Sequence, residues 1–525
     1  MPRFRIHKFE DSFQCIKDSG KRGKQGYVKK AHWYERKIKI GDVSLNKGSL
    51  IDFINSKSSP SEKLYKGWFN GRFFGLGGAK DSRVRRQLNA IFKNSTSLTS
   101  IPLSKVPSPP KPQLTKLNYE QLLENSKKFQ THVVKMQTED NQLAAMPEKA
   151  EQIAAFANAT HPFVSEKVWI LAHRFLELKK KNGTATEKLL YANLSLAEFF
   201  DRLITNRPIV FYLENDTSLL KDGTRVAGGF ESIGSNGEKD PLTLKNYLSY
   251  DEMQISAYLG LSTPTHFINN GSRHNGGKKG HDSFEETGIY YGMVGARFEK
   301  TGFMEDEFAM VRKNALRDPN KMALWSQFFE MDLPPFENVD PSSPRFIKVK
   351  EAYFDVEIYR AIMKPRIEAY LIDADSRSAE AGKLGYLHLV GLGLGVWAPQ
   401  GIDTKILGNI QRDIYLEVLK ERKFENIGIL NFSYFPDDVK NFSIDVADKT
   451  IEILTSKRNP ADKIPEGYLL CAQYAWDGNS FPGNEYWLGK LSCSGDPAAI
   501  CSSTLGELQN PLINPNARGP ALHVY

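Results

Sequence analysis

Hydrophobic residues recur with helical spacing along the chain before residue 205. The strongest pattern covers residues 164–181, whose apolar members follow i, i+3 and i+4 spacing. These members are Val168, Leu171, Phe175 and Leu178. The following Gly183 is typical of a helix end. Two further stretches have helical spacing, residues 119–136 and 148–158. The pattern predicts a helical domain over residues 118–204.

From about residue 205 the pattern changes to short apolar runs that alternate with helical stretches, which is typical of a layered α/β domain. The predicted strands are residues 208–213, 265–268, 367–372, 386–390, 427–432 and 468–472. The predicted helices are residues 248–261, 352–363 and 410–422. In open α/β sheets a ligand binds outside the carboxyl ends of the strands, so the loops after these strands are the expected place of a site. This domain is predicted to cover residues 205–525.

The chain before the helical domain has a different composition. Residues 101–113 contain five prolines and no hydrophobic periodicity, which predicts an extended linker over residues 101–117. Residues 1–113 carry 24 Lys+Arg and 8 Asp+Glu, whereas the rest carries 46 and 54. The basic clusters at residues 21–24 and 83–86 suit contact with an acidic surface, and a solvated basic face is the alternative. Residues 1–100 are therefore a basic N-terminal region.

Composition also restricts the compartment and the class of protein. No run approaches the roughly 18 apolar residues that span a bilayer, and no apolar segment of a signal peptide follows the basic start. The four cysteines form no CxxC pair and are too few for a disulfide framework. We expect a cytoplasmic protein without a transmembrane segment.

Three glycine-rich loops could bring backbone N–H groups close to a phosphate. They cover residues 226–237, 391–397 and 475–487, and each alone is more often an ordinary turn. The second loop reads GxGxG and is followed by Pro399, so it lacks the fingerprint of a nicotinamide-binding fold. The third loop places Gly and Asn beside aromatic residues that could stack on a base or ribose.

Two pairs of acidic residues are the candidate catalytic groups. Asp373 and Asp375 follow a predicted strand, where alternate residues share a face, so both carboxylates are expected to point into one pocket. Such a pair would split its pKa values into one proton donor and one stabilising charge, and a surface turn is the alternative. Asp251 and Glu252 stand near a predicted helix start, where they could instead complement the helix dipole.

Other types of catalytic site have weaker signals. The histidines at 266, 274 and 281 form no HExxH motif, so no metal site is predicted. No GxSxG motif and no phosphate-binding P-loop is present. Cys471 lies in a predicted core strand and is expected to be inert.

Several sequence blocks resemble the MavL-type macrodomain effectors of Legionella, and more distantly the poly(ADP-ribose) glycohydrolase macrodomains. The resemblance covers about residues 190–515, and Asp251 stands where the glycohydrolases have one of two paired glutamates. The blocks are YLSYDEMQIS, THFINNG, YLIDADSR, HLVGLGLGVW and CAQYAWDGNSFPGNEYW. The resemblance implies a macrodomain-like mixed sheet flanked by helices that binds ADP-ribose. The candidate ADP-ribose-binding residues are Asn215, Gly228, Gly229, Asn269, Asn270, Gly391, Gly393, Gly395, Asp477, Gly478, Asn479, Ser480 and Phe481.

The resemblance further implies a hydrolase that removes ADP-ribose from arginine in a modified protein, with ADP-ribosylated ubiquitin as substrate. No cofactor is required by this scheme, and ADP-ribose is the ligand or product. A bacterial effector of this kind would act in the host cytosol. Two alternatives remain: a non-catalytic reader of ADP-ribosylated proteins, and an interaction protein that its basic N-terminal region directs to an acidic surface.

Overall fold

The computed structural model describes residues 4–9, 12–17, 37–40, 43–46 and 106–525, with 133, 282, 437–438 and 447 excepted. The chain divides into two compact units, one of Met1–Val106 with Asp318–Leu324 and the other of Pro107–Arg317 with Trp325–Tyr525. The first unit contains a four-stranded sheet of order β2-β1-β3-β4. Its strands are β1 (Phe4–Phe9), β2 (Ser12–Lys17), β3 (Lys37–Ile40) and β4 (Val43–Asn46). The basic clusters at residues 21–24 and 83–86 lie outside the described residues.

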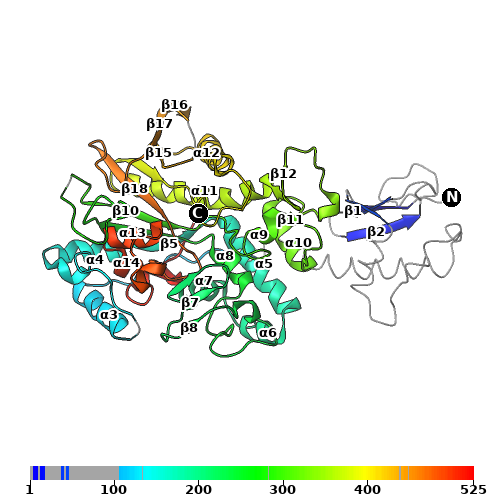
Figure 1. The fold of residues 1–525 in the computed structure, drawn as a ribbon, viewed down its shortest axis with the longest axis horizontal. Helices are drawn as coiled ribbons and strands as arrows, with labels where there is room; N and C mark the ends of the chain where they lie inside the picture. The colour runs from blue at the N-terminus through cyan, green and yellow to red at the C-terminus, as the bar shows by residue number, and fades with distance from the viewer. Residues whose placement is uncertain are drawn as a thin grey trace. The chain divides into compact units, whose positions relative to one another are not determined.

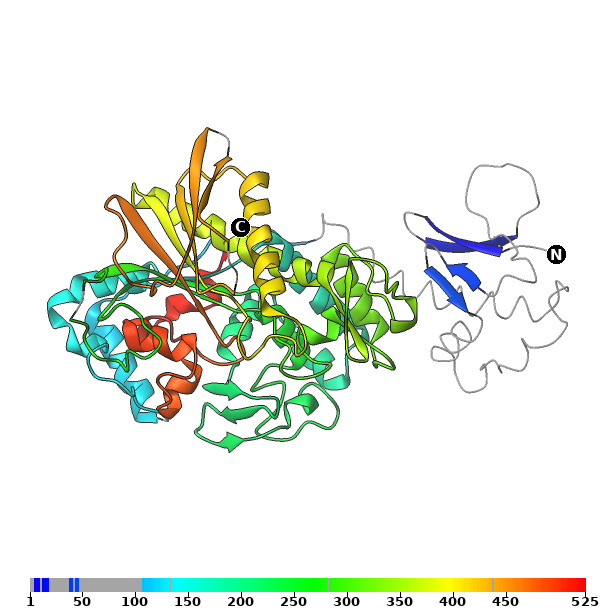
Figure 2. The ribbon, with the colours of Figure 1, turned by 45° about the horizontal axis from the view of Figure 1, so that its top comes forward.

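A nine-stranded mixed sheet forms the centre of the second unit (Figure 1), in the order β16-β17-β15-β14-β18-β10-β9-β5-β19. The five strands from β17 to β10 run parallel to one another, while β9 and β16 run antiparallel to their neighbours. The nine strands are β5 (His161–Val164), β9 (Gly260–His266), β10 (Thr287–Met293), β14 (Leu384–Leu389), β15 (Ile427–Ser433), β16 (Phe442–Val446), β17 (Lys449–Ser456), β18 (Tyr468–Ala475) and β19 (His523–Val524). Figure 2 shows the β16–β17 pair projecting at one edge of this sheet.

Helices cover both faces of the sheet, which confirms the predicted α/β class (Figure 1). On one face, Tyr370 of α11 and Tyr415 of α12 contact β10 and β18. On the other face, Tyr474 donates a hydrogen bond to Gln509 just after α14. The helices are α3 (Tyr119–His132), α4 (Ala150–Asn158), α5 (Glu166–Asn182), α6 (Ala185–Tyr191), α7 (Leu196–Thr205), α8 (Tyr250–Ser256), α9 (Asp306–Ala309), α10 (Pro319–Phe329), α11 (Val356–Glu380), α12 (Thr404–Glu421), α13 (Gly495–Ser502) and α14 (Leu505–Leu508). None of the described helices is long and apolar enough to cross a membrane.

Two small antiparallel sheets flank the main one. The sheet β6-β7-β8 consists of β6 (Val210–Tyr212), β7 (Thr217–Leu219) and β8 (Arg225–Val226). The sheet β11-β13-β12 consists of β11 (Met310–Arg312), β12 (Phe346–Val349) and β13 (Ala352–Asp355). The predicted strand at 208–213 is therefore real, but it belongs to a small sheet beside the central one.

The helices before residue 205 form where the sequence predicts them. The helix predicted over residues 164–181 is α5, and its apolar stripe is buried. Capping boxes begin α6 and α7, because Thr184 and Ser195 each exchange hydrogen bonds with the glutamate three residues later. The region is not purely helical, however, since β5 lies within it and joins the central sheet through β9.

The segment before α3 has no regular secondary structure from residue 107 to residue 118, but it is attached to the rest of the unit. The N–H of Gln113 donates to the carbonyl of Pro520 at 2.7 Å, and the N–H of Thr115 donates to the Asn516 side chain at 2.7 Å. The Pro107 carbonyl accepts from the indole of Trp169 at 2.7 Å. The described part of the predicted linker therefore has no regular secondary structure and is hydrogen-bonded to the folded unit.

One predicted strand is wrong and another is displaced. Residues 367–372 lie inside α11, where Ile367, Tyr370 and Leu371 are buried together. A helix that is buried on several sides lacks a polar face, so its apolar run resembles a core strand. The strand predicted at 265–268 is β9, which ends at His266.

Candidate active site

Three neighbouring parallel strands deliver their following loops to one edge of the central sheet. β10 and β18 end side by side, because Met293 pairs with Ala475, and β14 adjoins β18 on its other side. The loops that follow cover residues 294–300, 476–483 and 390–398. Two of these loops are among the glycine-rich loops singled out in the sequence. The carboxyl edge of a parallel sheet is where ligands bind in open α/β folds.

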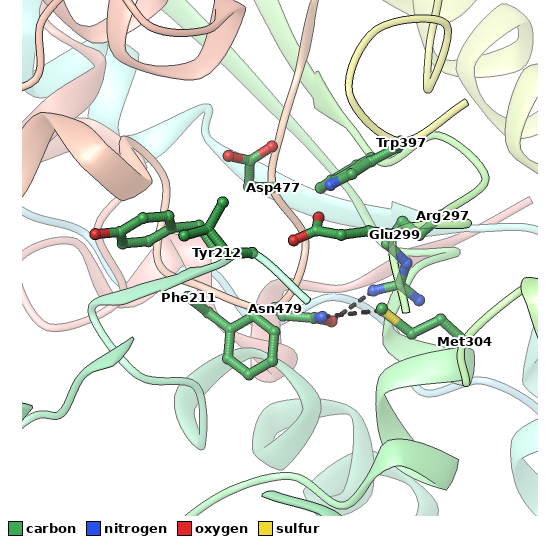
Figure 3. A pocket seen from close by; sticks show the side chains of 9 residues that line it. Phe211, Tyr212, Arg297, Glu299, Met304, Trp397, Asp477 and Asn479 are labelled. Atoms are coloured by element: carbon green, nitrogen blue, oxygen red, sulfur yellow. Dashed lines mark hydrogen bonds between the residues drawn. The ribbon is translucent and has the colours of Figure 1, made fainter. Parts of the chain in front are cut away.

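A small pocket lies at this edge (Figure 3). One wall comes from β6 and the turn after it, and the other walls come from the three loops that follow β10, β14 and β18. The lining residues are Phe211, Tyr212, Leu213, Arg297, Glu299, Met304, Trp397, Asp477 and Asn479. Asp477 and Asn479 are thus the two predicted ligand-binding residues that line the pocket.

Two carboxyl groups face the pocket. Figure 3 shows the Glu299 carboxylate pointing between Tyr212, Asp477 and Asn479. Burial raises the pKa of Glu299, and Asp216 and Glu485 add to this shift, while Trp397 and Arg297 oppose it. Burial also raises the pKa of Asp477 well above its usual value, and Glu485 and Asp496 act in the same direction. Groups of this kind can carry a proton near neutral pH, as acid–base catalysis requires.

Further acids surround Asp477 behind the pocket. Asp496 is fully buried and accepts hydrogen bonds from the N–H of Gly483 at 2.6 Å and of Asp477 at 3.3 Å. Asn484 donates to Asp477 Oδ2 at 2.6 Å, which fixes the position of that carboxyl group. Because several acids share a small volume, burial and mutual repulsion favour protonated forms.

The opposite side of the pocket is formed by a buried arginine. Arg297 is 1% exposed, and Glu305 accepts hydrogen bonds from its Nε at 2.8 Å and from its Nη2 at 3.0 Å. Nη1 of Arg297 donates to the Asn479 side chain, as Figure 3 shows. Burial and the two arginines around it act in opposite directions on Glu305, and the net effect lowers its pKa. The pocket therefore combines acidic groups with a fixed positive charge.

Two of the predicted glycines are required by close packing. A Cβ on Gly393 would lie 2.6 Å from the carbonyl oxygen of Ala296, and its φ is +74°. A Cβ on Gly478 would lie 2.3 Å from the side chain of Val294. Both glycines therefore let the loops after β14 and β18 approach the segment after β10.

The other predicted residues of these loops do not line the pocket. Ser480 and Phe481 are fully buried, and Phe481 is part of the hydrophobic core. Asn215 is exposed in the turn after β6, where its carbonyl accepts a hydrogen bond from the N–H of Gly228 at 2.6 Å. The remaining glycines of the prediction, none of them lining the pocket, are Gly229, Gly391 and Gly395.

Asn269 and Asn270 lie at the opposite edge of the sheet from the pocket. They follow β9, which runs antiparallel to β10, so that His266 at the end of β9 pairs with Thr287 at the start of β10. Asn269 organises its own turn by accepting a hydrogen bond from the N–H of Gly271 at 2.9 Å. The carboxyl end of an antiparallel strand therefore does not contribute to this site.

Asp373 lies in a closed hydrogen-bond network away from the pocket. Its Oδ1 accepts hydrogen bonds from His161 Nε2 and from the Tyr525 hydroxyl, both at 2.6 Å, and its Oδ2 accepts from Ser262 at 2.8 Å. Burial opposes ionisation, but these neighbours, with His161 first, hold the pKa of Asp373 below its usual range. Asp373 is 0% exposed, and its carboxylate oxygens are used by protein groups.

The same network contains two histidines and an aspartate, which are side chains of the kinds that bind metal ions. Ligand atoms of His161, Asp373 and His523 lie within 4.8 Å of one another. The two imidazole rings are stacked, with centroids 3.7 Å apart and planes 5° apart. Because the lone pairs lie in the ring planes, stacked parallel rings cannot both point at one ion. Arg377, whose Nη2 is 3.0 Å from His161 Nδ1, adds a positive charge beside them. The arrangement suits a hydrogen-bond network better than a metal ion.

The other three predicted acids also have structural partners. Asp375 accepts a hydrogen bond from the N–H of Asn426 at 2.7 Å, and it does not share a face with Asp373, because residues two apart on a helix point in different directions. Asp251 pairs with Lys179 at 2.5 Å. Glu252 is 0% exposed and receives two hydrogen bonds from Arg202 at 2.6 and 2.9 Å. None of these acids lines the pocket.

The fold and the pocket define an α/β domain with two carboxyl groups and aromatic side chains at the carboxyl ends of parallel strands, where open α/β folds bind ligands. Residues 120–525 match the model of a family described as ADP-ribosylhydrolase MavL-like. The chain therefore belongs to the MavL-like ADP-ribosylhydrolase family.

Two curated relatives agree with this assignment. ADP-ribosylarginine hydrolase CG3568 of Drosophila melanogaster is 35% identical over 416 residues, which cover 72% of this chain and 81% of the relative. ADP-ribosylarginine hydrolase CG2909 of the same organism is 34% identical over 418 residues, with the same two shares. These findings confirm the predicted enzyme class, a hydrolase that removes ADP-ribose from protein.

Proposed function

We propose that this enzyme hydrolyses the bond between ADP-ribose and an arginine side chain of a modified protein. The observation that carries the proposal is that Glu299 and Asp477, which follow two adjacent parallel strands, face one pocket and both have a raised pKa. The names of the two relatives support an arginine linkage.

The two acids have different parts in the proposed reaction. Asp477, whose pKa is raised more strongly, holds a proton and gives it to the departing guanidine nitrogen as the bond to the ribose carbon breaks. Glu299 accepts a proton from the water that attacks this carbon. One water is consumed, free ADP-ribose and unmodified arginine are formed, and the two acids exchange their protonation states. No cofactor takes part in this scheme.

The walls of the pocket suit an arginine side chain. Tyr212 and Trp397 present aromatic rings, which attract cations, and a guanidinium stacks readily on such rings. The carboxyl groups of Glu299 and Asp477 can accept its hydrogen bonds. Serine or glutamate linkages offer no planar cation, so the pocket favours arginine over them.

The finer parts of the sequence interpretation remain proposals. We propose that the central sheet is a macrodomain and that ADP-ribosylated ubiquitin is the modified protein, because the sequence blocks resemble MavL-type proteins. We also propose a cytoplasmic site of action, on the basis of the cysteine content. The suggested contact of the basic N-terminal region with an acidic surface belongs with these proposals.

The test is release of ADP-ribose from a protein modified on arginine, compared with the same protein modified on serine. Asp477→Asn and Glu299→Gln should each lower kcat at least about 100-fold, because each removes a proton-transfer group. Asp375→Asn is the matched control, since this acid is predicted from the sequence but does not line the pocket. It should change the rate less than about twofold.

Each failure has a separate meaning. Full activity of Asp477→Asn would contradict the assignment of the proton donor, and loss of activity in Asp375→Asn would favour the acid pair predicted from the sequence. Calorimetric binding of ADP-ribose without any release from modified protein would favour the reader function. A parallel assay with ADP-ribosylated ubiquitin tests the proposed substrate.

A further inference from the structure

Every nitrogen of the Arg297 side chain has a partner. Nε and Nη2 bind both carboxylate oxygens of Glu305, Nη2 also donates to the carbonyl of Met253 at 3.0 Å, and Nη1 donates to Asn479 Oδ1. The backbone N–H of Arg297 adds a further bond to Glu305 at 2.9 Å. A guanidinium held at all three nitrogens and 1% exposed has one orientation.

This fixed guanidinium determines how the Asn479 amide is oriented. Arginine has only hydrogen-bond donors, so the atom of Asn479 that faces it must be the oxygen. The other end atom of the amide is therefore the nitrogen, and its partner among the described residues is Met304 Sδ at 3.3 Å, a weak acceptor (Figure 3). Asn479 lines the pocket and is 6% exposed. It offers the pocket an N–H donor that the protein itself does not satisfy well.

The charge behind this donor is positive. Arg207, Arg297 and Arg366 are each at most 2% exposed. Glu305 accepts hydrogen bonds from both Arg297 and Arg366, whereas Arg207 donates to the backbone carbonyl of Leu203 at 2.7 Å. Burial, with Arg297 next, lowers the pKa of Arg207 to about 9, so it remains charged at neutral pH. A positive potential next to an N–H donor favours an electron-rich oxygen as its partner.

We propose that Asn479 donates a hydrogen bond to an oxygen of the bound ADP-ribose group, and that Arg297 is the positioning residue that fixes this amide in its donating orientation. The proposal rests on the proposed function, since ADP-ribose is taken as the ligand. The oxygen belongs to one of two parts of ADP-ribose. One part is the ribose that is attached to the modified protein, with its phosphate, and the other is the adenosine with its phosphate. The shared chemistry is an acceptor oxygen beside positive charge.

The test uses calorimetric titration of the full chain with ADP-ribose, ribose 5-phosphate and AMP. Asn479→Asp keeps an oxygen for Arg297 but replaces the donor by a second oxygen. It should raise the Kd for ADP-ribose about 10- to 100-fold, while the melting temperature stays equal or increases, because Arg297 gains a carboxylate partner. Leu213→Asp is the control for added charge, since Leu213 lines the pocket and is 54% exposed. Leu213→Asp should raise the Kd for ADP-ribose by less than half the factor measured for Asn479→Asp.

The second variant tests the positioning role. Arg297→Lys keeps the charge but cannot hold Glu305 and Asn479 at once, so it should raise KM with a smaller effect on kcat. When Arg297→Lys is combined with Asn479→Asp, KM should rise little beyond its value in Asn479→Asp alone, because the oriented donor is already absent. If Asn479→Asp weakens the binding of ribose 5-phosphate but not of AMP, the oxygen lies on the ribose side of ADP-ribose. If it weakens the binding of AMP alone, the oxygen lies on the adenosine side.

Three results would overturn the proposal. If wild-type protein binds ADP-ribose and Asn479→Asp binds it equally well, Asn479 is not a donor to the ligand, and the proposed function is unaffected. If Leu213→Asp weakens binding as much as Asn479→Asp, charge explains the effect and the donor does not. If wild-type protein does not bind ADP-ribose at all, the proposed function fails first and this inference fails with it.

Discussion

Replacing Glu252 by Gln separates a structural from a catalytic role for one of the acids predicted from the sequence. Glu252 is 0% exposed, and Arg202 donates two hydrogen bonds to it. The N–H of Ser249 donates to Glu252 Oε2 at 2.9 Å, and Glu252 returns its own N–H to Ser249 Oγ, which forms the capping box of α8. The substitution would leave the buried Arg202 without its counter-charge.

The expected cost follows from these contacts. Breaking a buried ion pair by removing one partner costs about 3–5 kcal/mol. The same motif without a buried arginine occurs at Glu198, which forms the capping box of α7 with Ser195 on the surface. Glutamine can also serve at this position of a capping box, so the same change at Glu198 should cost less than about 1 kcal/mol. Glu198→Gln is therefore the matched control, and the difference between the two variants, about 2–5 kcal/mol, measures the buried pair.

The measurement is urea unfolding followed by tryptophan fluorescence, with hydrolase activity measured on the folded variants at low temperature. We expect Glu252→Gln to unfold at much lower urea and to keep near wild-type activity per folded molecule. The reasoning would be refuted if Glu252→Gln were as stable as Glu198→Gln but at least about 100-fold less active, because that pattern belongs to a catalytic group.

Two further predictions concern the pocket. Because the pKa of Asp477 is raised by burial and by Glu485, activity should fall as the pH rises through this pKa. Glu485→Gln removes a negative charge and lowers that pKa, so the alkaline limb of the pH–rate profile should move about one pH unit toward acid, and an unmoved limb would contradict this. A Cβ on Gly295 would lie 2.2 Å from the N of Gly393, so Gly295→Ala should cost about 1–3 kcal/mol in a thermal melt. Gly395→Ala, with open space around its Cβ, should be neutral, and equal effects would argue against close packing as the cause.

The parts of the fold that the sequence predicts well are those with a clear period. The stripe of α5 is amphipathic because one face packs on the core and the other meets water. The strands β14, β15 and β18 are short apolar runs between polar loops, as buried parallel strands usually are. In both cases most of the apolar positions in the sequence have side chains that are buried in the structure.

The long helix α11 was predicted only in part, because residues 356–363 fall in the predicted helix 352–363 whereas residues 367–372 were predicted as a strand. Pro365 stands inside it, and proline ordinarily ends or bends a helix. Its second half is buried on several sides, so no polar face marks the helical period. This single error moved Asp373 and Asp375 from a helix to the end of a strand and suggested a shared pocket that the structure does not contain.

About half of the chemistry of the pocket could be found in the sequence. Asp477 and Asn479 stand in a glycine- and aromatic-rich loop after an apolar strand, and this pattern predicted both as ligand-binding residues. Glu299 and Arg297 follow β10, whose sequence TGIYYGM contains two glycines and so is a poor strand pattern. Tyr212 reaches the pocket from a separate small sheet, and no local pattern can indicate such a contact.

The segments that line the pocket are far apart in the sequence, so they are synthesised at different times during translation. Residues 211–213 are made first, residues 297–304 and 397 follow, and residues 477–479 are made after all of these. β18, at the centre of the sheet between β14 and β10, is made after both of these neighbours. A nascent chain that stops before this strand has Glu299 but neither Asp477 nor the strand that joins the two halves of the sheet. Under the roles proposed for Glu299 and Asp477, chains cut short before residue 468 should therefore lack hydrolase activity.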